Sequence, residues 1–254
     1  MINTLKYITI TTLILLLIPI AAALSGWQWE PVNMSSNIKL VLWITESATY
    51  PWVIFTNIFL FGYFSLCLKS RPYSILLLLV FLASITLIGQ SVKSLLKNRI
   101  QSLRPYDVWI EKNYSSKIHK YHNQQYVESQ EELYKILSHN KNISPHLMHH
   151  WFSSSKFSCP SGHTLFVATW ALLGAGLLWS RRCYFSILFL LIWAIAVMGS
   201  RLLLGMHWPK DLLAAIMLSW LIVTLAIFLL HHARTLLLSG INKQKRNKSI
   251  TRDF

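Results

Sequence analysis

Charged residues are scarce in this chain. Only 13% of its 254 residues are Asp, Glu, Lys or Arg, whereas a soluble domain usually carries about 25%. The hydrophobic share is 54%, and several apolar runs approach the roughly 20 residues that a helix needs to cross a bilayer. The composition excludes an ordinary soluble domain and predicts an all-α, polytopic membrane protein.

Acidic residues are the scarcest class, with 9 Asp and Glu against 24 Lys and Arg, so that the net charge is +15. Such an excess is also found in nucleic-acid-binding proteins. Here many of the basic residues stand in short loops beside apolar runs, as membrane topology requires. The bilayer is therefore the expected partner, nucleic acid is not, and no obligate protein partner is evident.

Cysteine is also rare, with three residues at positions 67, 159 and 183. The predicted topology puts Cys67 and Cys183 near one membrane face and Cys159 near the other, so these residues do not suggest a disulfide framework. No fixed-period repeat is visible, which argues against a repeat architecture.

Six apolar segments are predicted to span the membrane. They are residues 7–24, 52–68, 73–88, 163–179, 184–198 and 211–230. The first could be a signal peptide, because three alanines near its end resemble a cleavage site, but its length favours a retained helix. A Trp-rich stretch follows it, and residues 37–44 there are expected to lie along the membrane interface.

The remaining segments define the predicted domains. Residues 1–233 form one membrane domain, and residues 94–157 are an inserted, polar, mainly helical subdomain that holds most of the acidic residues. Residues 234–254 form a basic tail, which its composition predicts to be disordered.

With six spans, the basic residues of the short loops all fall on one side, which the positive-inside rule makes cytoplasmic. These residues are Lys6, Lys69, Arg71, Arg181, Arg182 and those of the tail. Both termini are then cytoplasmic, and the loops that carry the motifs described next face the opposite side together.

The first motif is KNRIQSLRP, which follows the third apolar segment and contains Lys97, Arg104 and Pro105. Arginine presents a planar fork of donors that matches phosphate oxygens, and lysine adds a point charge. On their own, two cations at a helix end are usually interfacial anchors, so this motif is a weak signal.

The second motif is Pro160-Ser161-Gly162-His163, where the fourth apolar segment begins. Glycine permits a close backbone approach, and the unpaired N–H groups of a helix N-terminus favour an anion. The Ser161 hydroxyl can donate a further hydrogen bond. An ordinary helix N-cap explains this motif equally well when it is taken alone.

The third motif contains Ser200, Arg201, His207 and Asp211 around the loop before the sixth segment. Pro209 suits the first turn of a helix, so Asp211 can reach back to the His207 imidazole. A carboxylate on one ring nitrogen fixes the tautomer and leaves the other nitrogen as a nucleophile. Together the motifs predict phosphate chemistry at a membrane surface.

In order and spacing, the motifs Lys-x6-Arg-Pro, Pro-Ser-Gly-His and Ser-Arg-x5-His-x3-Asp resemble those of the type 2 phosphatidic acid phosphatase superfamily. The stretches SGWQWEP, GQSVKSLLKNRIQSLRP and MGSRLLLGMHWPKDL are similar to bacterial members that act on phosphatidylglycerophosphate. The likeness extends over nearly the whole chain to about residue 231, and the basic tail lies outside it.

The resemblance implies a role for each motif residue. His207 would be the nucleophile that forms a phosphohistidine, and Asp211 would orient it. His163 would protonate the leaving alcohol and then activate water. The phosphoryl oxygens would be held by Lys97, Arg104, Ser161, Gly162 and Arg201. The family uses no metal, so neither a metal nor another cofactor is expected.

The resemblance further implies hydrolysis of phosphatidylglycerophosphate to phosphatidylglycerol at the periplasmic face of a bacterial inner membrane. It implies looser action on phosphatidic acid, diacylglycerol pyrophosphate and undecaprenyl pyrophosphate. One alternative is a phosphotransferase of the same family that passes phosphate to a lipid sugar. Another is an anion transporter, which would leave the pairing of His207 with Asp211 unexplained.

Overall fold

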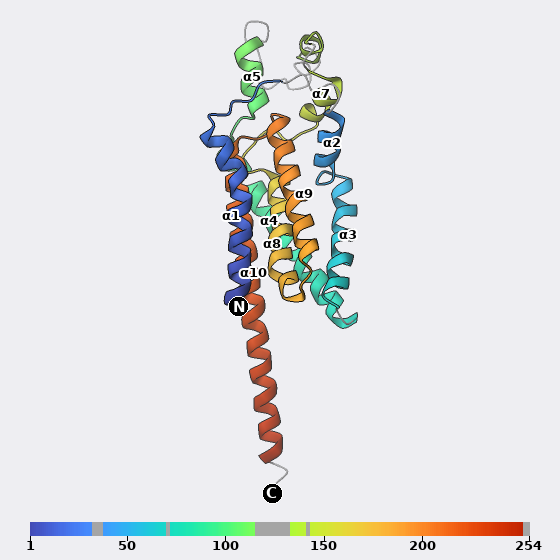
Figure 1. Ribbon diagram of the computed structural model, residues 1–254, viewed down its shortest axis with the longest axis vertical. Coiled ribbons are helices and arrows are strands. Elements are labelled where there is room, and N and C mark those ends of the chain that lie inside the picture. Colours follow the sequence, from blue (N-terminus) through green and yellow to red (C-terminus); the bar gives the residue numbers. More distant parts are fainter. Residues whose placement is uncertain (32–37, 70–71, 115–132, 141–142, 251–254) are drawn as a thin grey trace.

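The computed structural model describes residues 1–31, 38–69, 72–114, 133–140 and 143–250, and this part of the chain contains helices and no strand. The long helices are α1 (Ile2–Leu24), α3 (Trp52–Cys67), α4 (Pro72–Ile100), α8 (Gly162–Leu178), α9 (Tyr184–Leu203) and α10 (Pro209–Ile250). They run roughly side by side in one bundle (Figure 1). The prediction of an all-α protein is confirmed.

Five stretches are long and apolar enough to cross a membrane, so the chain is a multi-pass membrane protein. They are Ile2–Leu24, Ser74–Tyr114, Gly162–Arg181, Tyr184–Leu203 and Pro209–Ala233. The predicted second span, residues 52–68, corresponds to α3, which is apolar but has only 16 residues. The count of six spans therefore stays a prediction.

Helix α8 lies at the centre of the bundle and packs against α1, α9, α10 and α4. Small residues let these neighbours approach closely, because a Cβ at Gly174 would stand 2.6 Å from Leu190 and one at Gly176 would stand 2.7 Å from Ile227. Apolar side chains on the outer faces of α3 and α4, such as Phe55 and Leu76, are exposed, as expected of a lipid-facing surface.

A second hydrophobic cluster covers one end of the bundle (Figure 1). We call this region the cap; it comprises residues 27–31, 38–50, 105–114, 133–140 and 143–158. It contains α2 (Ile38–Glu46), α5 (Pro105–Tyr114) and α7 (Pro145–Phe152). Helix α2 has 9 residues, too few to cross a bilayer. It contains residues 38–44 of the predicted interfacial segment and continues to Glu46, while residue 37 lies outside the described residues.

Two tryptophans tie the cap to the end of α9. The indole of Trp29 donates to the carbonyl of Leu203 at 2.9 Å, and that of Trp151 donates to the carbonyl of Leu204 at 2.9 Å. Gly205 follows with a left-handed φ of +68°, and a Cβ there would stand 2.5 Å from the Trp29 ring. The loop that leads to His207 is thereby held between the cap and the bundle.

Two helices continue beyond the ends that the sequence predicts. Helix α4 continues to Ile100, well past the predicted end of its apolar segment at 88. Helix α10 continues to Ile250, so the prediction of a disordered tail is wrong for residues 234–250. These residues include one glycine, no proline and many Leu, Lys and Arg, which favour helix. The described parts of residues 94–157 are largely helical, whereas residues 115–132 and 141–142 lie outside the description.

Candidate active site

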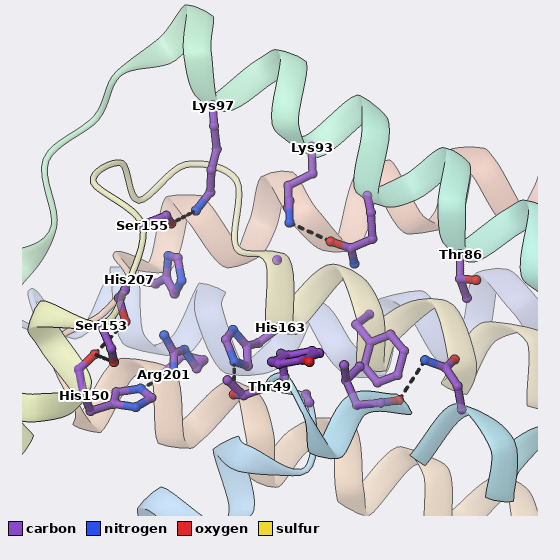
Figure 2. A pocket seen from close by; sticks show the side chains of 18 of the residues that line it. Thr49, Thr86, Lys93, Lys97, His150, Ser153, Ser155, His163, Arg201 and His207 are labelled. Carbon is purple, nitrogen blue, oxygen red and sulfur yellow. Dashed lines mark hydrogen bonds between the residues drawn. The ribbon is translucent and has the colours of Figure 1, made fainter. Parts of the chain in front are cut away.

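A cavity of about 520 Å³ lies between the cap and the bundle (Figure 2). Six of the eight predicted site residues line it, namely Lys97, Arg104, Gly162, His163, Arg201 and His207. The other two, Ser161 and Asp211, are buried behind this layer. No carboxylate is among the residues that line the cavity, so the cations there leave a net positive charge for an anion.

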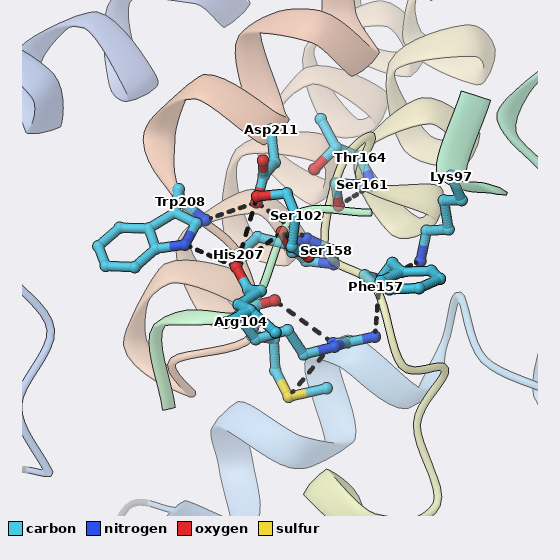
Figure 3. Close-up of polar contacts among 12 residues, drawn as sticks. Lys97, Ser102, Arg104, Phe157, Ser158, Ser161, Thr164, His207, Trp208 and Asp211 are labelled. Atoms are coloured by element: carbon cyan, nitrogen blue, oxygen red, sulfur yellow. Dashed lines mark hydrogen bonds and ion pairs between the residues drawn. The ribbon is translucent and has the colours of Figure 1, made fainter. Parts of the chain in front are cut away.

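The His207 ring faces the cavity and is almost fully buried, with an exposed fraction of 1%. Its Nδ1 lies 3.6 Å from Asp211 Oδ2 (Figure 3). This is longer than a hydrogen bond, and such contacts often tighten only when substrate binds. Burial, together with the positive charges of Arg104 and Arg201, holds the pKa of His207 well below its usual range. The ring is therefore neutral at physiological pH, as a nucleophile must be.

Asp211 also has a structural task at the start of α10. Its Oδ2 accepts a hydrogen bond from the backbone N–H of Trp208 at 2.8 Å, next to Pro209 in the first turn. A carboxylate that reaches back to the residue before the helix is the reciprocal half of a capping box. This helix-capping contact fixes the Asp211 carboxylate close to the His207 imidazole.

His163 enters the cavity from the first turn of α8. Ser161, the N-cap of this helix, accepts a hydrogen bond from the backbone N–H of Thr164 at 3.3 Å. The His163 Nε2 lies 2.7 Å from the hydroxyl of Thr49, which in turn donates to the carbonyl of Thr45 at 3.0 Å. The ring plane of His163 is thus set by the cap, and Ser161 supports the helix end from behind.

Lys97 and Arg104 converge on the loop that follows α7. The Lys97 ammonium donates to Ser155 Oγ and to the carbonyl of Phe157, each at 2.9 Å. The Arg104 guanidinium donates to the carbonyl of Ser155 at 3.0 Å and to that of Met206 at 3.3 Å. Two cations share one serine, so their positions are coupled through the cap.

Arg201 is 1% exposed and lies near the end of α9. Its Nη1 donates to Thr45 Oγ1 and to His150 Nε2, both at 2.9 Å. Because the guanidinium is always a donor, His150 must be neutral here, and burial and Arg201 lower its pKa to about 3. The Arg201 Nε is buried without a partner in the described part of the chain.

The sequence model of the PAP2 superfamily matches residues 72–235, more than half of the chain. This chain belongs to the PAP2 superfamily. Phosphatidylglycerophosphatase B of Escherichia coli (strain K12) is 43% identical over 216 residues, which cover 85% of each chain. Phosphatidylglycerophosphatase B of Haemophilus influenzae is 30% identical over 225 residues, which cover 85% of this chain and 92% of that one. These findings show a membrane lipid phosphatase, which is a phosphoric monoester hydrolase.

The PAP2 motifs did not reveal the cap residues that hold the motif side chains. Thr45, Thr49, His150 and Ser155 carry no sequence signal, because their partners are distant in the chain and are brought close only by the fold. One further residue that lines the cavity, Lys93, could have been found from the sequence. Lys93 stands four residues before Lys97, a spacing that puts both on one face of a helix.

Proposed function

We propose that this PAP2 protein hydrolyses phosphatidylglycerophosphate to phosphatidylglycerol and phosphate through a phosphohistidine at His207. The observation that supports this best is the buried pair of His207 and Asp211, 3.6 Å apart, at a cavity lined by four cations and no carboxylate. The two relatives, whose names state phosphatidylglycerophosphatase activity, support the same substrate.

In the first step, His207 Nε2 attacks phosphorus while Asp211 stabilises the positive charge that develops on the ring. The bond between phosphorus and the glycerol oxygen breaks, and His163 donates its proton to that oxygen. Phosphatidylglycerol leaves, and the phosphoryl group remains on His207. The leaving alkoxide needs this proton because it is a poor leaving group.

In the second step, His163 takes a proton from water as the water oxygen attacks the phosphohistidine. The P–N bond breaks, inorganic phosphate leaves, and both rings return to their starting states. Throughout, the phosphoryl oxygens are held by Lys97, Arg104, Arg201 and the backbone of Gly162 at the α8 N-terminus. Ser161 acts from behind as the cap of that helix rather than as a direct ligand.

The test uses purified protein in lipid with a panel of phosphatidylglycerophosphate, phosphatidic acid, diacylglycerol pyrophosphate and undecaprenyl pyrophosphate. Release of inorganic phosphate from phosphatidylglycerophosphate, with slower release from the other three, is the expected result. A lipid-sugar acceptor is added in parallel. If phosphate moved to that acceptor and none were released free, the protein would be a phosphotransferase instead.

Metal dependence is a second test of the mechanism. In the described part of the chain no group of three or more His, Cys, Asp or Glu could hold a metal ion. Activity should therefore persist in chelator, and vanadate should inhibit by mimicking five-coordinate phosphorus. A strict Mg²⁺ requirement would contradict the mechanism.

We further propose an orientation: six spans in a bacterial inner membrane, with residues 94–157 forming a periplasmic subdomain and both termini cytoplasmic. The N-terminus lies at the end of the bundle opposite the cap, which supports this arrangement (Figure 1). In this view residues 1–233 are the phosphatase domain and residues 234–254 are a cytoplasmic extension.

Cysteine labelling tests the orientation in a variant in which Cys67 and Cys183 are serine. Cys159 does not interfere, because it is buried and burial raises the pKa of its thiol to about 11. An impermeant thiol reagent added outside the inner membrane should label Lys112→Cys on α5 and should not label Arg181→Cys. The reverse pattern would overturn the topology.

A further inference from the structure

Three consecutive serines, at positions 153–155, follow α7 and line the cavity. The hydroxyls of Ser153 and Ser154 both donate to the carbonyl of His150, at 3.2 Å and 2.7 Å. Such bonds are the usual local contacts of serines near a helix end, and they use the hydroxyl hydrogens. Ser155 differs from its two neighbours, because its hydroxyl donates to no acceptor within the described part of the chain.

The Ser155 hydroxyl oxygen accepts hydrogen bonds from two cations. Lys97 Nζ donates to Ser155 Oγ at 2.9 Å (Figure 2), and Arg104 Nη2 donates to the same atom at 3.0 Å. A hydroxyl has two acceptor lone pairs and one O–H donor. Since both lone pairs are occupied, the only hydrogen bond that Ser155 Oγ can add is one in which it donates.

The two cations also determine which acceptor suits this hydroxyl. Hydrogen bonds in a chain polarise one another, so a hydroxyl that accepts from two positive groups is a stronger donor than an ordinary serine. The positive charge beside it favours an anionic acceptor. Within the described part of the chain no carboxylate lines the cavity, so the anionic oxygen has to come from a bound ligand.

The hydrogen bonds of Arg104 give a second reason for such a donor. All three of its guanidinium nitrogens donate to the protein, because Nε and Nη2 donate to the carbonyl of Ser155 and Nη1 donates to that of Met206. A direct hydrogen bond from Arg104 to a phosphoryl oxygen would require one of these contacts to break. The Ser155 hydroxyl transmits the effect of the Arg104 charge to a ligand while these contacts stay in place.

A simpler interpretation is that Ser155 is a passive acceptor, which holds Lys97 and Arg104 until a phosphate displaces it. That interpretation needs only the oxygens of Ser155 and gives its hydroxyl hydrogen no role. Figure 2 shows Ser155 next to Lys97 and near His207, at the part of the cavity where the phosphoryl group would be transferred. The hydrogen is therefore placed beside the anion that the cavity is charged to bind.

We propose that Ser155 Oγ donates a hydrogen bond to a phosphoryl oxygen of the substrate and keeps its contacts with Lys97 and Arg104 as it does so. Ser155 is then a phosphate-binding residue outside the three PAP2 motifs, and it is contributed by the cap. This inference rests on the proposed function, because it needs a phosphoryl group at His207. It does not depend on which lipid carries that group.

The first test compares Ser155→Ala with Ser153→Ala in the hydrolysis of phosphatidylglycerophosphate and in inhibition by vanadate. Ser155→Ala removes a donor to a charged acceptor, so kcat/KM should fall roughly 10- to 100-fold and the inhibition constant of vanadate should rise about tenfold. Ser155→Thr keeps the hydroxyl and should restore both values. Ser153→Ala should match the parent, because the Ser153 hydroxyl donates to the carbonyl of His150.

The passive-acceptor interpretation predicts the opposite change in inhibition. Ser155→Ala would then free N–H groups of Lys97 and Arg104, and vanadate would inhibit at lower concentrations. That result would overturn the proposal. An unchanged inhibition constant would overturn it as well, because Ser155 would then only position the two cations, whatever the loss in kcat.

The structure of the parent protein with bound vanadate is a second test, which depends neither on the folding of a variant nor on the substrate. Ser155 Oγ should lie about 2.5–3.0 Å from a vanadate oxygen and remain in contact with Lys97 and Arg104. A separation above about 3.5 Å would overturn the proposal, as would the loss of both cation contacts. If the contact formed but the parent released no phosphate from phosphatidylglycerophosphate, the proposed substrate would be wrong and the role of Ser155 would stand.

Discussion

The bundle and the cap contribute to the candidate site in different ways. The bundle supplies His163, Arg201, His207 and Asp211, all within a few residues of a helix end. The cap supplies Thr45, Thr49 and His150, whose polar atoms contact those side chains at 2.7–2.9 Å. The bundle therefore presents the reacting groups, and the cap fixes their orientation.

This division has a physical origin. A helix end leaves unpaired backbone N–H or C=O groups and a partial charge, so ionisable side chains gain function there without disturbing a membrane-embedded helix. Such an end cannot by itself restrain a long side chain. The cap supplies the restraint, because its tryptophans donate hydrogen bonds to the carbonyls of Leu203 and Leu204 and so attach it to the same helix that carries Arg201. Reacting groups should accordingly be far more sensitive to substitution than the cap residues that touch them.

The largest expected effect is at His207. Removing the nucleophile in His207→Ala should lower kcat by at least about 10⁴-fold and leave no acid-labile, base-stable phosphoenzyme. Asp211→Asn should keep the fold and lower kcat by roughly 10²–10⁴-fold, since it removes the negative partner of the developing imidazolium. Rates are measured as phosphate release, with folding checked by thermal unfolding. Ordinary turnover in His207→Ala would contradict the mechanism.

The next effect depends on the substrate and concerns His163. A lipid alkoxide needs a proton to leave, so His163→Ala should lose roughly 10²–10⁴-fold with phosphatidylglycerophosphate. An aryl phosphate leaves readily without that proton, so it should still phosphorylate His207. The second step should then stall because water is not activated. A single-turnover burst with accumulated phosphoenzyme is expected.

Two outcomes would exclude these tasks for His163. A folded His163→Ala protein with neither a burst nor trapped phosphate would make His163 a phosphate-binding residue instead of the acid. Steady turnover of the aryl substrate at the parental rate would exclude the activation of water. His207→Ala serves as the blank, since it should show no burst with either substrate.

A smaller effect on kcat is expected from a change at Thr49, the cap residue that contacts His163. Thr49→Val removes the hydroxyl that lies 2.7 Å from His163 Nε2 and keeps the size and branching of the side chain. Loss of one such hydrogen bond costs about 0.5–1.5 kcal/mol, so kcat should fall roughly 3- to 10-fold. KM and the unfolding temperature should change little, and Thr49→Ser should restore the rate. If Thr49→Val lowered kcat as much as His163→Ala does, the prediction that Thr49 only positions the reacting histidine would be wrong.

The bundle and the cap also differ in how much of each could be predicted from the sequence. Apolar runs and helix-end motifs predicted the all-α fold, five of the long apolar helices, and the eight candidate residues that the structure brings to one cavity or its back wall. Ser161 was expected to donate to phosphate; its hydroxyl oxygen accepts from Thr164 as the N-cap of α8, and donation to phosphate stays a prediction. The cap partners were not predicted, because the contact of Arg201 with His150 spans 51 residues and that of His163 with Thr49 spans 114. No local periodicity encodes such pairings.

The smallest expected effect is a pH dependence of stability that originates in the cap. His150 accepts a hydrogen bond from Arg201, and burial together with the charges of Arg201 and Arg104 lowers its pKa to about 3. In the unfolded chain the pKa is about 6.5. Between these values the unfolded chain binds more protons than the folded one, so the free energy of unfolding falls as the pH drops from about 6.5. The contribution is complete above this pH.

Thermal unfolding of the detergent-solubilised protein at pH 7 and at pH 5 measures this effect. His150→Gln keeps an amide oxygen that can accept from Arg201 but cannot titrate, so its destabilisation between the two pH values should be smaller than that of the parent by on the order of 1 kcal/mol. The exposed neighbour His149 provides the matched control, because His149→Gln should leave the parental pH dependence in place. If both variants kept the parental slope, His150 would not be the group that titrates, and the restraint on Arg201 would come from Thr45 alone. A reduced slope only in His150→Gln would show that the cap holds Arg201 through a neutral imidazole, which couples the positioning of a phosphate-binding residue to pH.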